Sequence, residues 1–369
     1  MAIRRKITSC ATAESCQAGK LSLRYQMTFN PGNILIIDFG QLGDVVMSLP
    51  SLRAVRAQFP LARITVAVGK PAGEIVNLSG YADATIEIDR VAIRDGFKPL
   101  SILKILDVVK DVRRRQFDFV IDLHSFSETN LLGFFSGARK RLFARRRGRS
   151  LDFLANFSPA PPIEEGNRTR HQVDRYLDVL RPLGINDAPR VPRLATRFED
   201  DREVDRLLRK AKAEADVPLV GLFPGAGHES RRWPLEKFAQ LADSLSRNDR
   251  VRPLVFVGPE EAKRISEIRA AFPPSALVLD RLSIRQLAAL QARLAVFVSN
   301  DTGPLHIAAA VGVPVVLLLD GRAPDSYIPL SEPKRVIQRG AISEITAEEV
   351  YEATRALLAA GRVEKLFAS

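Results

Sequence analysis

The feature that most constrains the fold is a repeated alternation of short apolar runs with segments of helical spacing. "NILIID" (33–38) and "ARITVAVG" (62–69) are rich in β-branched residues and are typical of buried strands. Between them, "VVMSLPSLRAVRAQF" places Val46, Leu49 and Leu52 at helical spacing. A strand, a helix and a second strand form a βαβ unit, in which the two strands lie parallel. The first half of the chain is therefore predicted to contain a parallel α/β sheet.

The alternation starts again in the second half, which predicts a second parallel-sheet domain. Apolar runs that end in turns occur in "PLVGLFPGAG", "RPLVFVGPEE", "AVFVSND" and "PVVLLLD". Between the halves, "GINDAPRVPRLATRFEDD" is rich in proline and charge, as expected of a connection. We predict a flexible leader at 1–29, an N-terminal domain at 30–185, a linker at 186–198, a C-terminal domain at 199–340 and a C-terminal helix at 341–369.

Two amphipathic helices carry further expectations. "LSILKILDVVKDVRRR" (100–115) is expected to turn Leu103, Leu106 and Val109 toward the protein interior. The C-terminal helix is expected to pack back across the cleft onto the N-terminal domain.

The composition is that of an ordinary soluble protein, with 46% hydrophobic and 27% charged residues. The longest apolar run, "VPVVLLL", is far shorter than the roughly 20 residues of a membrane-spanning helix. The N-terminus lacks the apolar segment of a signal peptide, so we expect a cytoplasmic protein. Cys10 and Cys16 have no further ligands nearby and are expected to be reduced thiols in the leader, and no metal site is expected. Met27 is a candidate start of the folded protein.

The formal net charge is +12, which favours anionic partners such as nucleic acid, phospholipid headgroups or phosphorylated substrates. Part of it lies in "RKRLFARRRGR" (139–149), where seven of eleven residues are basic, Arg145 and Arg146 among them. Such a run is either a solvated face or a surface that contacts an anion, and the sequence leaves both open.

Polar residues gather where predicted strands end, which is where open parallel sheets bind ligands. The first of these clusters is "SNDTGPLH", residues 299–306. The first amides of a helix lack partners and carry the positive end of its dipole, so Thr302 and Gly303 are candidates to bind a phosphate. Asp301 and His306 lie beside them. Each alone is explained by helix capping or by an ordinary buried histidine, but the four together favour a binding site.

The second cluster is "PGAGHESRRWP", residues 224–234. Its small residues, Gly225 among them, let the backbone approach a ligand closely. One arginine is expected to bind a diphosphate, because guanidinium matches phosphate oxygens, and we choose Arg231 over Arg232. The alternative places both arginines in solvent and Trp233 in the core.

Two further turns carry weaker signals. In "GPEE", Glu260 is a candidate partner for a ribose hydroxyl, although an acidic residue at a helix start is equally ordinary. In "GQLGD", Gly40 and Gly43 lack the spacing of the dinucleotide fingerprint. Asp44 opens a helix, where capping is the default role, but a carboxylate at a strand end also suits a general base.

With these turns in order, the chain resembles glycosyltransferase family 9, the heptosyltransferases of lipopolysaccharide core assembly. The resemblance rests on "ILIIDFGQLGDVVMSLPSLRAVRAQFP", "FDFVIDLH", "HQVDRYLDVLRPLG", "PGAGHESRRWP" and "SNDTGPLHIAAAVGVPVV". It implies a GT-B architecture, in which two Rossmann-like domains face a central cleft. It also implies inverting, metal-independent transfer without a cofactor, typically of heptose from ADP-heptose to an anionic lipid-linked glycan at the inner face of the cytoplasmic membrane.

By motif position, the resemblance makes Asp44 the candidate general base and makes Arg231, Asp301, Thr302, Gly303 and His306 donor-binding groups. Together with the residues taken from the turns themselves, the donor-binding set also includes Gly225 and Glu260. Gly40, Gly43, Arg145 and Arg146 are placed on the acceptor side. The chain departs from the Arg-x-Ser-x-x-Gly-Asp pattern of many members, because Asp38 and Gly40 replace the arginine and the serine.

Three rival functions stay open at this point. A nucleic-acid-binding protein would account for the charge, but no recognised reading motif accompanies it, so we expect no nucleic-acid partner. A sugar-nucleotide epimerase of the same fold would convert the donor without an acceptor. A non-catalytic binding protein would keep the fold alone.

Overall fold

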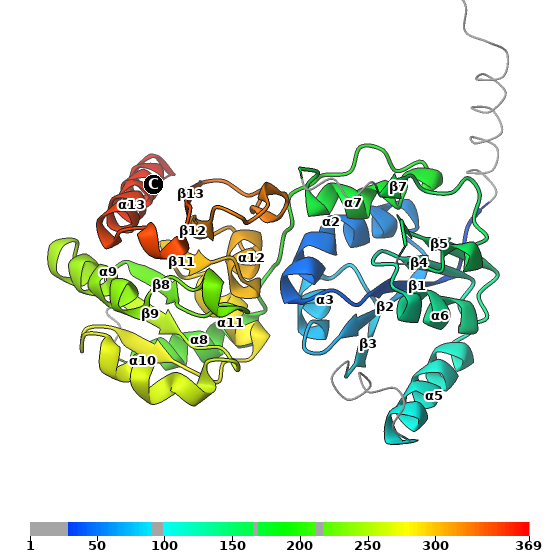
Figure 1. Cartoon of the computed structure of the whole chain (residues 1–369), viewed down its shortest axis with the longest axis horizontal. Coiled ribbons are helices and arrows are strands. Elements are labelled where there is room, and N and C mark those ends of the chain that lie inside the picture. Colours follow the sequence, from blue (N-terminus) through cyan, green and yellow to red (C-terminus); the bar gives the residue numbers. More distant parts are fainter. Residues whose placement is uncertain (1–28, 90–98, 149, 165–168, 212–216, 369) are drawn as a thin grey trace, which may run out of the picture.

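The computed structural model describes residues 29–368 except 90–98, 149, 165–168 and 212–216. Two α/β domains lie side by side, each built on one parallel sheet (Figure 1). The predictions for Cys10, Cys16 and Met27 concern residues outside the described ranges. Phe29 was assigned to the leader, but it belongs to the folded domain, because its ring packs edge-on against those of Phe119 and Phe157.

The N-terminal sheet has five parallel strands in the order β3-β2-β1-β4-β5. The strands are β1 (Asn33–Asp38), β2 (Arg63–Gly69), β3 (Ala84–Ile88), β4 (Phe119–Asp122) and β5 (Lys140–Phe143). The helices of this domain are α2 (Leu42–Gln58), α3 (Gly73–Ser79), α5 (Pro99–Arg114), α6 (Ser127–Phe135) and α7 (Gln172–Asp178). A small pair, β6 (Arg145–Arg146) and β7 (Ile163–Glu164), lies outside the main sheet.

The C-terminal sheet has six parallel strands in the order β10-β9-β8-β11-β12-β13. The strands are β8 (Leu219–Phe223), β9 (Arg252–Phe256), β10 (Leu277–Leu279), β11 (Val296–Asn300), β12 (Val315–Asp320) and β13 (Lys334–Arg339). The helices are α8 (Phe198–Lys210), α9 (Leu235–Asn248), α10 (Ile265–Ala271), α11 (Ile284–Gln291), α12 (Gly303–Ala310) and α13 (Ala347–Ala368).

The central strands are apolar along their length because helices cover both faces of each sheet. Residues 34–37 of β1 and 315–318 of β12 are at most 1% exposed, as expected of parallel sheets. In each sheet the order reverses once, between β1 and β4 and between β8 and β11. Such a reversal opens a crevice beyond the strand ends, where ligands of open α/β sheets bind. The fold therefore has two candidate crevices, one in each domain.

Two helices differ from the expectations of their sequences. The apolar side of α13 packs on α9 and on β11 to β13 of its own domain, and it does not return to the N-terminal domain (Figure 1). In α5, Leu103 is 59% exposed and Leu106 is 57% exposed, so neither faces the interior. The buried side of α5 is instead the stripe around Val112, which is fully buried. No helix in the described ranges is long and apolar enough to cross a membrane.

Candidate active site

The crevices of the two domains meet where helix α2 approaches helix α12. At Gly43, the first turn of α2, an added Cβ would lie 2.9 Å from Cδ2 of His306. At Gly303, the first residue of α12, an added Cβ would lie 3.0 Å from Cβ of Leu42. The two helix starts are this close only because both positions lack a side chain. Two of the predicted site glycines thus bring the predicted acceptor and donor sides together.

The two carboxylate oxygens of Asp44 have different surroundings. Oδ2 accepts a hydrogen bond of 2.9 Å from the backbone N–H of Gln41, so this oxygen caps α2. Oδ1 has no hydrogen bond with any residue that the structure describes. Burial raises the pKa of Asp44 above 3.8, although the attraction of His124 opposes the shift. Capping and proton acceptance therefore do not compete for one atom.

A buried pair of Asp38 and His124 lies beside Asp44, at the reversal between β1 and β4. Oδ1 of Asp38 is 3.1 Å from Nδ1 of His124 and accepts 2.9 Å from the N–H of Gly40. Burial acts to raise the pKa of Asp38, but the hydrogen bond and charge of His124 outweigh it and lower that pKa. The imidazole is thus the side-chain partner of this buried carboxylate.

Gly40 allows this pair and Asp44 to come together. An added Cβ would lie 2.4 Å from Cβ of Asp44 and 3.0 Å from Cε1 of His124. A serine here would collide with both side chains. His124 was not among the predicted site residues, although its place at the end of a predicted strand, in "FDFVIDLH", was the available signal.

The loop that carries His124 is fixed by Asp122 at the end of β4. Oδ1 of Asp122 accepts from the backbone N–H groups of His124 (3.0 Å) and Ser125 (2.7 Å), and Oδ2 accepts from Nδ2 of Asn130 (2.8 Å). All four side chains are buried. The imidazole is therefore positioned by its own backbone.

On the donor side, Asn300 connects two loops that lie far apart in the sequence. Its Oδ1 accepts from the N–H of Trp233 (3.1 Å), and its Nδ2 donates to the carbonyls of Pro224 (3.3 Å) and Gly225 (2.9 Å). Trp233 is 1% exposed and donates its indole N–H to Ile345 (2.9 Å), so it is a core anchor. Asn300 was not singled out from the sequence, yet it positions the loop of Gly225 next to Asp301.

The two arginines of this loop have different surroundings. Arg232 donates to the carbonyl of Ala226 (3.1 Å) and lies 3.8 Å from Glu261, so it holds the loop. Arg231 has a side chain that is 58% exposed, and its Nη1 lies 4.0 Å from Oδ2 of Asp301. Of the two, Arg231 is thus the one with a guanidinium available to a ligand.

In the turn after β9, Glu261 and not the predicted Glu260 lies next to the loop of Gly225. Glu260 is exposed, whereas the neighbouring Glu261 is 5% exposed and lies directly under Gly225. An added Cβ at Gly225 would lie 2.6 Å from the Glu261 carboxyl group. Burial raises the pKa of Glu261, and the charge of Glu260 adds to this shift. The carboxyl group that contacts the loop of Gly225 is therefore that of Glu261.

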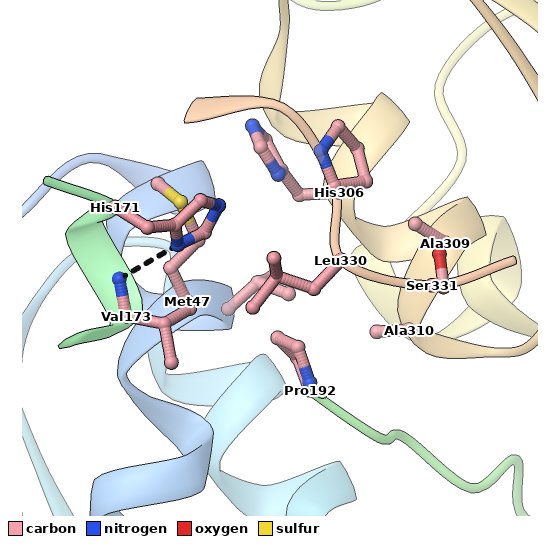
Figure 2. Close-up of a pocket in the computed structure, with 11 residues that line it drawn as sticks. Met47, His171, Val173, Pro192, His306, Ala309, Ala310, Leu330 and Ser331 are labelled. Carbon is pink, nitrogen blue, oxygen red and sulfur yellow. Dashed lines mark hydrogen bonds between the residues drawn. The ribbon is translucent and has the colours of Figure 1, made fainter. Parts of the chain in front are cut away.

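The remaining predicted donor-binding residues lie at the start of α12, and they are Asp301, Thr302, Gly303 and His306. Nε2 of His306 is 3.7 Å from Oδ1 of Asp301, and the ring is buried. The hydroxyl of Thr302 bonds that of Ser299 at 3.0 Å and does not cap the helix. Figure 2 shows His306 facing His171 and Met47 of the other domain across a narrow pocket. That pocket measures about 10 Å³, the room of a single water, so no sugar nucleotide fits there.

The predicted acceptor arginines point in opposite directions, as neighbouring strand residues do. Arg146 lies under the ring of Phe126 and pairs with Glu164 at 2.9 Å, and Glu164 also pairs with Arg175 at 3.0 Å. Arg145 pairs with Asp152 at 3.1 Å and lines a separate open pocket of about 350 Å³. Only Arg146 belongs with the groups that surround His124.

Comparisons with known proteins agree with this architecture. The model of glycosyltransferase family 9 (heptosyltransferase) matches residues 105–353. Lipopolysaccharide heptosyltransferase 2 of Escherichia coli (strain K12) is 26% identical over 319 residues, covering 83% of this chain and 87% of that protein. Lipopolysaccharide core heptosyltransferase OpsX of Haemophilus influenzae is 22% identical over 314 residues, covering 83% and 84%.

Solved structures share the fold. A glycosyl transferase family 9 protein from Veillonella parvula gives a TM-score of 0.78 at 22% identity, over 89% of this chain and 97% of that one. The E. coli ADP-heptose lps heptosyltransferase II gives 0.74 at 23% identity, over 89% and 99%. The predicted GT-B architecture with two Rossmann-like domains is thereby confirmed.

Replacing Asn300 with alanine tests whether this side chain holds the loop of residues 224–233 in place. Asn300→Ala leaves the Trp233 N–H and two carbonyls without partners, so the free energy of unfolding should fall by about 2–4 kcal/mol. Ser230→Ala, on the exposed part of the same loop, should change it by less than about 0.5 kcal/mol. Urea unfolding measures both. Equal stability of Asn300→Ala and the wild type would rule out this role.

Proposed function

Because the chain belongs to glycosyltransferase family 9 and is a glycosyltransferase, we propose that it transfers heptose from ADP-heptose to an anionic lipid-linked glycan of the lipopolysaccharide core. The names of its relatives support this choice, since they include lipopolysaccharide heptosyltransferases. Further support comes from E. coli heptosyltransferase WaaC, whose structures with ADP and with ADP-2-deoxy-2-fluoro heptose give TM-scores of 0.70 at 18% identity.

One observation carries the chemical part of the proposal. Oδ1 of Asp44, which has no hydrogen bond within the described part of the chain, lies at one helix start, and that helix start contacts the N-terminus of α12. A proton acceptor thus stands opposite the positive end of a helix dipole. Transfer from a nucleotide sugar requires this pair, because the incoming hydroxyl must lose a proton while the departing diphosphate gains negative charge.

In the proposed reaction, Oδ1 of Asp44 takes the proton of an acceptor hydroxyl. The hydroxyl oxygen forms a bond to the anomeric carbon, and the bond from that carbon to the diphosphate oxygen breaks on the opposite face, so the configuration inverts. The first amides of α12, at Thr302 and Gly303, and the guanidinium of Arg231 stabilise the charge on the leaving diphosphate. His306 donates a hydrogen bond to the same diphosphate oxygens. The carboxyl group next to the loop of Gly225 is that of Glu261, which takes the place proposed for Glu260.

The acceptor would lie on the N-terminal side. Arg146, which lies beside the ring of Phe126 and pairs with Glu164, is the proposed contact for an acidic sugar or phosphate of the acceptor. The remaining basic residues of 139–149 would attract an anionic acceptor to the domain before it enters the cleft. With a lipid-linked acceptor, the enzyme would work at the inner surface of the cytoplasmic membrane.

Asp44→Asn separates catalysis from capping. Asparagine keeps an oxygen that accepts from Gln41 N–H, so the thermal midpoint should stay near that of the wild type, while kcat should fall by roughly 10²–10⁴-fold. The measurement is ADP release from ADP-heptose together with the glycosylated product. A loss of stability in proportion to activity would show that Asp44 only caps α2. Conversion of the donor in the absence of acceptor would favour the epimerase.

The pH dependence of transfer tests the surroundings of Asp44. Only the ionised carboxylate accepts a proton, and burial raises its pKa, so activity should fall with decreasing pH already above 3.8. His124→Gln removes the attraction that lowers this pKa, so the acidic limb of kcat/KM should move to higher pH. An acidic limb that does not move in His124→Gln would contradict the electrostatic link between the two residues.

A further inference from the structure

Helix α5 carries apolar side chains that none of the residues described by the structure covers. Val112 is fully buried against the N-terminal sheet, so the helix already has an inner face. Leu103 and Leu106 lie on another side of the helix and are 59% and 57% exposed. Lys110 and Arg114 follow on that same side at helical spacing. Figure 1 shows α5 projecting from the edge of the N-terminal domain.

Helix α6, which contacts α5, repeats the pattern. Leu131, Phe134 and Phe135 are separated by three and four residues and therefore share one face, and each is 40–44% exposed. The opposite face of α6 packs against the domain core, because Leu132 is buried and Gly133 lies close against the ring of Phe143. The exposed aromatic side of α6 thus contributes nothing to the core.

A third exposed ring extends this surface. Phe153, in the 3₁₀ turn Asp152–Leu154 that contacts α6, is 76% exposed. Arg141 connects the two elements, since its guanidinium lies 5.3 Å from the ring centre of Phe134 and donates to the carbonyl of Leu154 at 2.9 Å. We call this surface the α5–α6 face: its exposed apolar side chains are those of Leu103, Leu106, Leu131, Phe134, Phe135 and Phe153.

Positive charge surrounds the α5–α6 face. Residues 103–115 contain five Lys or Arg and two Asp or Glu, and residues 127–147 contain six and one. Two nearby carboxylates, Asp111 and Asp152, are paired with Arg115 (3.0 Å) and Arg145 (3.1 Å). Lys104, Lys110, Arg113 and Arg114 of α5 have exposed side chains, so positive charge is available at this face for an outside partner. A second copy of this face would bring like charges together, which disfavours self-association.

We infer that the α5–α6 face binds the surface of an anionic phospholipid bilayer. Its leucine and phenylalanine side chains enter the boundary between headgroups and acyl chains, and its lysines and arginines contact lipid phosphates. The inference extends the proposed function, because it identifies the surface that would hold the enzyme where a lipid-linked acceptor lies. It uses neither the donor nor the acceptor, so it stands or fails independently of heptose transfer.

Sedimentation of the full chain with phospholipid vesicles tests the inference. The wild type should bind vesicles of phosphatidylcholine with phosphatidylglycerol, bind phosphatidylcholine alone much more weakly, and be released by added salt. Leu106→Glu combined with Phe135→Glu should weaken binding to the mixed vesicles by roughly tenfold or more. The matched control is Leu61→Glu, an exposed leucine (95%) of the same domain outside the face, which should bind as the wild type does.

The thermal midpoint of each variant verifies that it folds, which is expected because the replaced side chains are exposed. Three results would overturn the inference: no binding of the wild type to the mixed vesicles, equal binding by the double variant, or equal loss in Leu61→Glu. Concentration-dependent dimerisation that the double variant abolishes would also overturn it, because the face would then bind a second copy of the chain.

Discussion

The contact between the starts of helices α2 and α12 is the feature on which the rest of the site depends. Gly43 and Gly303 let the backbones of two domains approach until the atoms of one helix start meet those of the other. Each helix follows a central strand at the reversal of its sheet, so both crevices open toward the same contact. A side chain at either glycine would push the two helix starts apart, and with them the proposed proton acceptor Asp44 and the first amides of α12.

The charges behind this contact show how the chain keeps its chemistry while departing from the pattern of many relatives. A buried carboxylate needs a partner, since desolvation disfavours its charge. Asp38 finds that partner in His124, across the reversal between β1 and β4. The partner of this carboxylate therefore comes from the loop after β4, on the other side of the reversal. In the C-terminal domain, Asn300 at the end of β11 accepts a hydrogen bond from the N–H of Trp233 and donates one to the carbonyl of Gly225. These bonds hold the loop of residues 224–233 at the end of the strand.

The sequence predicted what depends on local pattern, and it missed what depends on tertiary contacts. The buried strands were predictable because residues such as those of β1 and β12 are apolar throughout, and the turns of Asp44 and Asp301 follow from where strands end. For α5 the prediction was right for Val109, which packs against the core, and wrong for Leu103 and Leu106, because the sequence does not say which apolar residues of the helix meet the sheet. Spacing could not reveal that Arg145 and Arg146 serve different surfaces, or that α13 stays with its own domain.

A crystal structure of the protein with ADP is the most direct test of the central claim that the two helix starts form one site. The account predicts that the diphosphate accepts hydrogen bonds from the first amides of α12 and lies near the Arg231 guanidinium. Oδ1 of Asp44 should face the open side of the diphosphate, where the sugar would be. A nucleotide bound elsewhere, or an Asp44 carboxylate turned away from the diphosphate, would contradict the account.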